Sequence, residues 1–184
     1  KNTAGLPARW LELVKHTLAT LGPKVLATRM VQDYVNHLYA PAARGSRVAN
    51  ADNARLAREL ATWKQRVRAA WPSVQVEHVE AADISPAPQR GDSITVNAFV
   101  NLAGLRPDEV SVQLVHGRAD SNDCIIVPFT TEMTAADQYD GARWRFTATV
   151  SLTDAGSFGY NVRALPKHAG LANAAELGLQ ANAH

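Results

Sequence analysis

The chain has 184 residues, of which 46% are hydrophobic, and a formal net charge of +2. This length suffices for one sizeable core, or for a small β domain with a helical attachment. The small charge argues against a nucleic-acid partner, because domains that bind phosphate backbones carry a larger, clustered basic excess. No apolar run reaches the roughly 18 residues that span a membrane and no signal peptide opens the chain, so we expect a cytoplasmic protein without a membrane partner.

Helical periodicity dominates the first third of the chain. Proline or Gly-Pro at positions 22–23, 41 and 72 is expected to end the helices, and small residues at 42–47 predict a linker. The expected spans are about 6–21, 24–39 and 50–71. The apolar stripes of the first two helices are too wide for the pair to cover alone. We therefore expect another surface to cover them.

Strand periodicity replaces the helical pattern from Val74 onward. Six strands with turn residues between them predict an antiparallel β-sandwich of immunoglobulin-like type, in which Tyr160 would form a tyrosine corner. The expected strands cover about 74–78, 94–102, 110–114, 124–131, 144–152 and 158–164. A short helix over 171–179 and a frayed end at 181–184 complete the prediction. The fold class is α+β, with a helical segment at 1–71 and a β domain at 72–184.

Cys124 is the only cysteine, so no internal disulfide can form. It lies in the apolar run Cys124–Val127, which favours a small buried side chain over a reactive thiol. The six histidines are scattered, and no nucleophile elbow or phosphate-binding loop occurs. We therefore expect no catalytic, cofactor-binding or metal-binding residue in this chain.

Aromatic side chains could stack on sugars, but most of them lie on the alternating apolar faces of the predicted strands. Trp144, Phe146 and Phe158 are expected in the core for this reason. Phe99 and Tyr139 are the rings expected at the surface. They are the candidate carbohydrate contacts.

Five segments resemble a known family. Residues 8–18 and 26–35 are similar to the last helices of bacterial α-glucan phosphorylases of the long actinobacterial type. Residues 63–72 resemble the junction of those enzymes to an extra C-terminal domain. Residues 158–168 and 175–179 resemble the end of that domain.

The resemblance implies a parent enzyme in which phosphate attacks the terminal α-1,4-glucosyl bond, giving glucose 1-phosphate and a shorter glucan. It also implies pyridoxal phosphate on a lysine of the parent, upstream of this chain. The fragment would then be structural or accessory and would catalyse nothing alone. Its partners would be the catalytic domains of its own chain, α-1,4-glucan or a second copy. A stand-alone glucan-binding module and a dimerisation scaffold are the alternatives.

Overall fold

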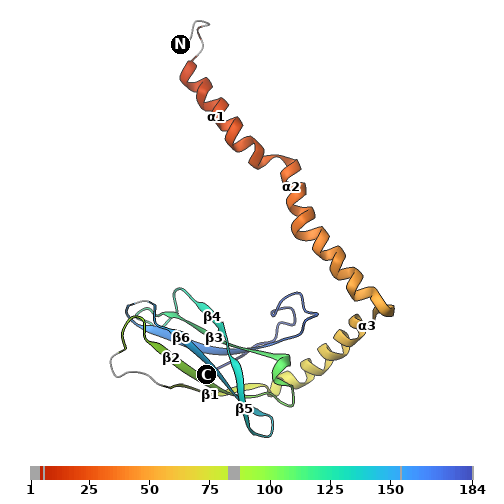
Figure 1. Ribbon diagram of the computed structural model, residues 1–184, viewed down its shortest axis with the longest axis vertical. Helices are drawn as coiled ribbons and strands as arrows, with labels where there is room; N and C mark the ends of the chain where they lie inside the picture. The colour runs from red at the N-terminus through yellow and green to blue at the C-terminus, as the bar shows by residue number, and fades with distance from the viewer. Residues whose placement is uncertain (1–4, 6, 83–87, 154, 184) are drawn as a thin grey trace. The chain divides into compact units, whose positions relative to one another are not determined.

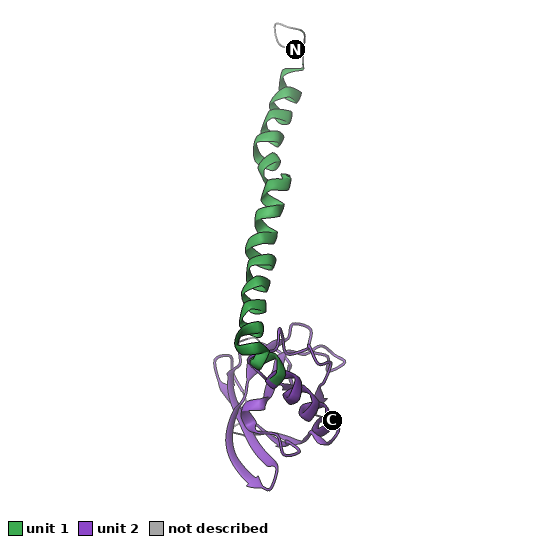
Figure 2. Ribbon diagram, turned by 90° about the vertical axis from the view of Figure 1, so that its right-hand side faces the viewer, with its two compact units in different colours: residues 1–58 green, residues 59–184 purple. Residues whose placement is uncertain are grey.

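The computed structural model describes residues 5, 7–82, 88–153 and 155–183. The chain divides into two compact units, residues 1–58 and residues 59–184 (Figure 2). The expected starts of the first helix at Leu6 and of the corner at Asp154 lie outside the described residues. The boundary between residues 71 and 72 stays a prediction for the domains of the parent.

The first unit is helical throughout most of its length (Figure 1). It contains α1 (Ala8–Val25), α2 (Ala27–Tyr34), a π-helical turn η1 (Val35–Tyr39) and the first part of α3 (Ala40–Ala70). The expected stop at Gly22–Pro23 is wrong, because α1 continues to Val25 with Pro23 inside it. A proline clashes with the Cβ of the residue before it, and Gly22 has none.

The expected end at Pro41 and the expected linker at 42–47 are also wrong. Both lie inside α3, whose early residues Ala42, Ala43 and Arg44 are strong helix formers. The π turn directly before Pro41 explains the continuation. There the Ala40 amide donates to the Val35 carbonyl five residues back, which widens the helix where proline lacks a donor.

A break divides α3 at residues 51–54. Ala51 is extended, and Asp52, Asn53 and Ala54 all have positive φ. Left-handed backbone is costly for residues with a Cβ, and Asn and Asp tolerate it best. The third helix was expected to begin near Asn50 or Asp52. The helical backbone resumes a few residues later, at Arg55.

Large apolar side chains of the first unit are exposed to solvent. Leu21 is 50% exposed and Trp10 is 60% exposed, and the same holds along α2 and η1. The set is Trp10, Leu13, Leu18, Leu21, Val25, Leu26, Met30, Val31, Tyr34, Val35, Leu38 and Tyr39. We call it the exposed apolar face. Among the described residues, no helix has the length and apolarity needed to cross a membrane.

Two antiparallel sheets of four strands make up the second unit. The first sheet has the order β1-β2-β6-β5 and the second has the order β4-β3-β7-β8. The strands are β1 (Gln75–Ala82), β2 (Ser93–Asn101), β3 (Val110–Arg118), β4 (Phe129–Glu132), β5 (Thr134–Asp140), β6 (Arg143–Ser151), β7 (Phe158–Pro166) and β8 (Ala181–Asn182). Two single 3₁₀ turns, η2 (Trp71–Ser73) and η3 (Pro107–Glu109), flank β1 and β3. The α+β class is confirmed.

One hydrophobic cluster contains residues from both sheets and from the end of α3. Alternate residues of β2 and β3 are its centre, with Val96, Val100 and Leu114 fully buried. Trp63 and Val67 of α3 belong to the same cluster. The last turns of α3 are therefore part of the β unit rather than a separate attachment.

Three local predictions in the β unit are wrong. Residues 124–128 are not a strand, and only Phe129–Glu132 pairs with β3. Residues 171–179 form turns rather than a helix, and the expected frayed end contains β8, which pairs with β7. The strand β5 was missed, because its exposed sequence Thr134–Asp140 lacks an apolar alternation.

Candidate functional site

The two rings chosen from the sequence as carbohydrate contacts lie side by side on the outer face of the first sheet. Phe99 of β2 and Tyr139 of β5 have ring centroids 5.5 Å apart, and the His78 ring of β1 lies 5.7 Å from Phe99. Tyr139 is 44% exposed, as expected, whereas Phe99 is half-buried between its neighbours. We call these three rings the outer ring cluster.

Two β-bulges bring the outer ring cluster together. A register shift between Val76 and His78 turns Glu77 and His78 outward in succession. A second shift between Gln138 and Asp140 makes Tyr139 the extra residue of β5. Bulges re-aim side chains and concentrate next to functional surfaces.

Charged groups surround the rings. Arg143 of β6 donates to both Glu77 oxygens at 2.9 and 3.0 Å and to Asp140 at 2.8 Å. Arg145 donates to Asp137 at 2.8 Å, and the Tyr139 hydroxyl donates to Glu77 at 3.3 Å. Burial and the Glu77 charge raise the pKa of Tyr139, so its hydroxyl stays protonated at neutral pH.

The ring geometry limits what this surface can hold. The Phe99 and Tyr139 rings are at 79° to each other, an edge-to-face pair that offers no shared flat surface. One sugar ring could stack on either of them, with hydroxyls bonded to Glu77 or Arg143. Such a surface could hold a single sugar unit.

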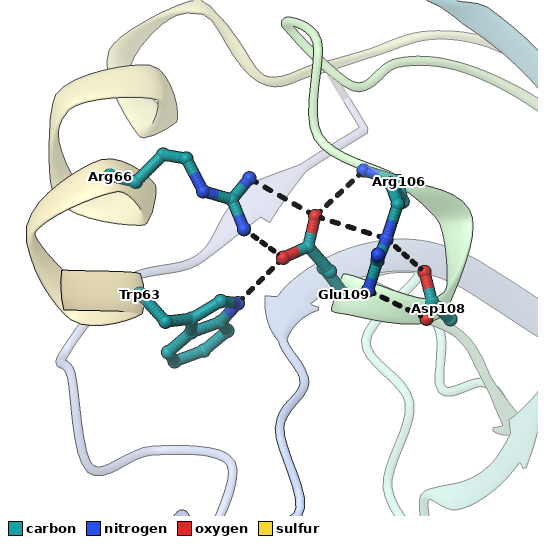
Figure 3. Close-up of polar contacts among 5 residues, drawn as sticks. All are labelled: Trp63, Arg66, Arg106, Asp108 and Glu109. Carbon is teal, nitrogen blue, oxygen red and sulfur yellow. Dashed lines mark hydrogen bonds and ion pairs between the residues drawn. The ribbon is translucent and has the colours of Figure 1, made fainter. Parts of the chain in front are cut away.

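A second polar cluster fixes the end of α3 to the β unit (Figure 3). The buried Glu109 carboxylate accepts from Trp63 Nε1 at 2.9 Å, from the Arg106 amide at 3.1 Å and from both terminal nitrogens of Arg66. Arg106 in turn pairs with the exposed Asp108 at 3.0 Å. Bidentate Arg–carboxylate pairing fixes orientation as well as position. We call this set the Glu109 network.

The Arg66 guanidinium, acting against the cost of burial, lowers the pKa of Glu109 to about 2. The same bond raises the pKa of Arg66. Both partners are therefore charged at neutral pH. A fully bonded carboxylate has no free oxygen for chemistry, so this network holds the fold together.

The described part of the chain has no residues suited to hold a metal ion or pyridoxal phosphate. No group of three His, Cys, Asp or Glu residues there could hold a metal ion. Pyridoxal phosphate requires a lysine in a closed cleft. Of the described lysines, Lys15 and Lys24 are exposed on α1, while Lys64 and Lys167 pair with Glu176 and Glu132. These residues do not fit the cofactor.

Other side chains singled out from the sequence lie elsewhere. Phe146 is buried as expected, and Trp144 and Phe158 are half-buried. Cys124 is exposed rather than buried, because its loop does not join the sheet. Tyr160 is 36% exposed, and among the described residues its hydroxyl has no partner, so the expected tyrosine corner is wrong.

The fold defines an α+β protein whose antiparallel β unit is fastened to the end of a helix by the Glu109 network. A family model described as "Glycogen phosphorylase C-terminal domain" matches residues 71–184. The chain belongs to this family.

Curated relatives align with almost all of this chain. It is 47% identical over 179 residues to a glycogen phosphorylase of Mycobacterium bovis, and 46% identical to that of Mycobacterium tuberculosis. A maltodextrin phosphorylase of Thermococcus litoralis is 28% identical over 175 residues. These alignments cover 94–97% of this chain but only 20–21% of each relative, so the chain spans about a fifth of their length.

Proposed function

We propose that this chain is the C-terminal part of an α-glucan phosphorylase, which releases glucose 1-phosphate from α-1,4-glucans in the cytoplasm. Pyridoxal phosphate and the catalytic residues would belong to the upstream region of the parent. The helical first unit would pack on that region, and the β unit would be an accessory domain. The family match carries the assignment to a phosphorylase, and the exposed apolar face carries the proposed packing.

The extent of that face supports a covering partner within the parent. A soluble protein seldom exposes a contiguous apolar patch larger than a few hundred Å². The exposed apolar face has twelve large side chains between residues 10 and 39. The relatives contain about four fifths of their length beyond the part that aligns with this chain. That region is long enough to supply the missing surface.

The experiment measures association of this chain with the separately expressed upstream region of its parent, without sugar. Leu21→Asp places a charge on the exposed apolar face, whereas Ala19→Asp places it two residues away, about 200° around the helix. We expect Leu21→Asp to weaken binding at least about tenfold, because an unpaired charge is costly to bury. Ala19→Asp should bind as the unchanged chain does.

Equal binding by the two variants, or no binding of the unchanged chain, would contradict the proposed packing. Self-association of the free chain with the same pattern would instead support the dimerisation scaffold. Glucose 1-phosphate formation by the upstream region, with and without this chain, then measures how far the accessory part supports catalysis.

We also infer that the β unit is an immunoglobulin-like sandwich. If the eight strands are lettered A, B, C, C′, D, E, F and G in chain order, the two sheet orders become A-B-E-D and C′-C-F-G. These orders are typical of immunoglobulin domains. Such domains often serve as accessory modules, although the fold alone does not define a ligand.

A second candidate function is α-glucan binding through the outer ring cluster. The two bulges that turn His78 and Tyr139 toward Phe99 favour it. Tyr139→Ala should then abolish retention of this chain on immobilised amylose, whereas Tyr160→Ala, the loss of a ring of similar exposure, should not. Equal retention of both variants would rule out the outer ring cluster.

A further inference from the structure

A cleft of about 400 Å³ opens between the ends of the two sheets. One wall comes from the second sheet, with His116 at the end of β3, Phe129 and Thr131 in β4, and Phe158 at the start of β7. Ser151, at the end of β6, supplies the wall from the first sheet. The cleft lies within the second unit and away from the outer ring cluster.

Three rings form a continuous strip along the cleft. Phe129 and His116 have centroids 6.2 Å apart with an interplanar angle of 31°, and His116 and Phe158 are 5.9 Å apart at 35°. The three rings come from adjacent strands, and each ring plane is tilted from the next by a small angle. The strip is therefore flatter than the nearly perpendicular pair Phe99 and Tyr139.

Polar groups complete the lining in a pattern that suits a sugar. Arg118 and the hydroxyl-bearing residues Thr130, Thr131, Ser151 and Ser157 line the same cleft. A sugar ring presents C–H groups on its faces and hydroxyls around its edge, so it matches an aromatic floor with hydrogen-bonding walls. A phosphate group would require several cations, and among the described residues of this lining Arg118 is the one with a permanent charge.

His116 contributes a neutral ring to the floor. Its Nε2 lies 3.0 Å from the Thr131 hydroxyl, which fixes the orientation of the imidazole. Burial lowers the pKa of His116, so the ring carries no charge at neutral pH. A neutral imidazole beside two phenyl rings keeps the floor of the cleft apolar.

Phe129 is the exposed member of the strip. It belongs to a short edge strand and is 54% exposed. Ile126, in the loop before it, is 52% exposed and does not line the cleft. Phe129 therefore has free ring surface for a ligand. Ile126 is a matched apolar side chain that a ligand in the cleft would not contact.

We propose that this cleft binds the terminal glucosyl units of an α-1,4-glucan, stacked on Phe129, His116 and Phe158. The choice of an α-glucan rests on the proposed phosphorylase function. Successive units of an α-1,4-linked chain are inclined to one another, which suits a strip whose neighbouring ring planes are tilted by 31° and 35°. The site would hold the polymer end near the enzyme without taking part in its chemistry.

The test is an NMR titration of this chain with maltoheptaose. We expect shifts centred on the amides of residues 129–131 and 158 and on the ring nitrogens of His116. Phe129→Ala should weaken binding about tenfold. Ile126→Ala should change it less than about twofold, which controls for a general loss of apolar surface. Cellohexaose, with flat β-1,4 linkages, should bind at least about tenfold more weakly.

Each other outcome overturns the proposal. Shifts centred on Phe99 and Tyr139 would assign binding to the outer ring cluster instead, and no shifts at millimolar sugar would remove the cleft as a site. Equal binding of cellohexaose would contradict the α-glucan assignment. Association with the upstream region is measured without sugar, so failure of the cleft and failure of the proposed function are distinguishable.

Discussion

Glu109 is a charged side chain buried in the β unit. Its contribution to stability depends on the hydrogen-bond donors around it. Replacing Glu109 by Gln keeps an acceptor for Trp63 but removes the charge that Arg66 and the Arg106 amide bind. We expect Glu109→Gln to lower the free energy of unfolding by about 1–3 kcal/mol, because the half-exposed Arg66 guanidinium and the Arg106 amide lose their charged acceptor.

Urea denaturation measures this change. Asp108→Asn is the matched control, since Asp108 is the adjacent residue, carries the same charge and is exposed in its pair with Arg106. Its effect should stay below about 0.5 kcal/mol. A loss as small for Glu109→Gln as for Asp108→Asn would show that the Glu109 network contributes little.

The lowered pKa of Glu109 predicts a specific loss of stability in acid. Its folded pKa of about 2 lies below its ordinary value of 4.5, so the unfolded chain binds the proton more readily. The stabilisation is fully present above pH 4.5 and is lost as the pH falls toward 2, by up to about 3 kcal/mol. Urea midpoints measured between pH 6 and pH 2.5 test this.

The Glu109→Gln variant should show a flatter dependence over this interval, since it has no carboxyl group at position 109. A parallel fall in the unchanged chain and the variant would assign the acid sensitivity to other carboxylates, such as Glu176, whose pKa is also lowered by its bond with Lys64.

Among the elements, the loop over residues 119–128 depends on two glycines. Gly117 of β3 and Gly159 of β7 are directly opposite each other, and the loop crosses the sheet at that point. A Cβ at position 117 would lie 2.3 Å from the Val127 carbonyl oxygen, whereas a Cβ at 159 would lie 3.2 Å from Ile125 and Ala119 side-chain atoms.

Gly117→Ala should therefore displace the loop backbone and cost about 2–3 kcal/mol. Gly159→Ala requires the Ile125 side chain and the Ala119 Cβ to move by only a few tenths of an ångström, and it should cost about 1 kcal/mol. Neither glycine has positive φ, so the difference reports space alone. Urea midpoints of the two variants give the comparison, and the reverse order would show that the loop does not rest on Gly117.

The sequence predicted the elements that have one consistent period. Apolar and polar residues alternate along β2, β3, β6 and β7, which lie in the centres of their sheets. Their buried faces could therefore be predicted. Edge strands are different. The strand β5 is exposed and carries two bulges, and β8 has two residues, so neither leaves a pattern in the sequence.

Only some residues of the candidate sites could be predicted from the sequence. Phe99 and Tyr139 could be chosen as surface rings, but the bulges that bring them together with His78 depend on the register of two strand pairs. Phe129 was not chosen as a surface ring, although Pro128 before it indicates an edge or a bulge in the predicted strand. The apolar run Cys124–Val127 favoured burial of that segment instead.

For the whole molecule, the two units should differ in how firmly they hold their backbone hydrogen bonds. Residues 59–70 of α3 bury Trp63 and Val67, whereas no large apolar side chain between residues 8 and 38 is buried. We expect amides of residues 8–38 to exchange hydrogen faster than those of residues 59–70, and to slow down as concentration rises.

Hydrogen-exchange mass spectrometry at two protein concentrations tests this expectation. Fragments from β2 and β3 are the internal control, since their exchange should not depend on concentration. Uniformly slow exchange in a dilute monomer would mean that the helices are covered within this chain, and the proposed packing on the upstream region would lose its basis.

The exposed Cys124 has a consequence for handling the protein. A sole accessible thiol gives each molecule one point of covalent attachment, so air oxidation can join two copies and no more. Such a dimer would have its junction on the 119–128 loop rather than on the helices. A reductant cleaves the disulfide and leaves apolar association intact. Size-exclusion chromatography with a reductant therefore distinguishes the two kinds of dimer.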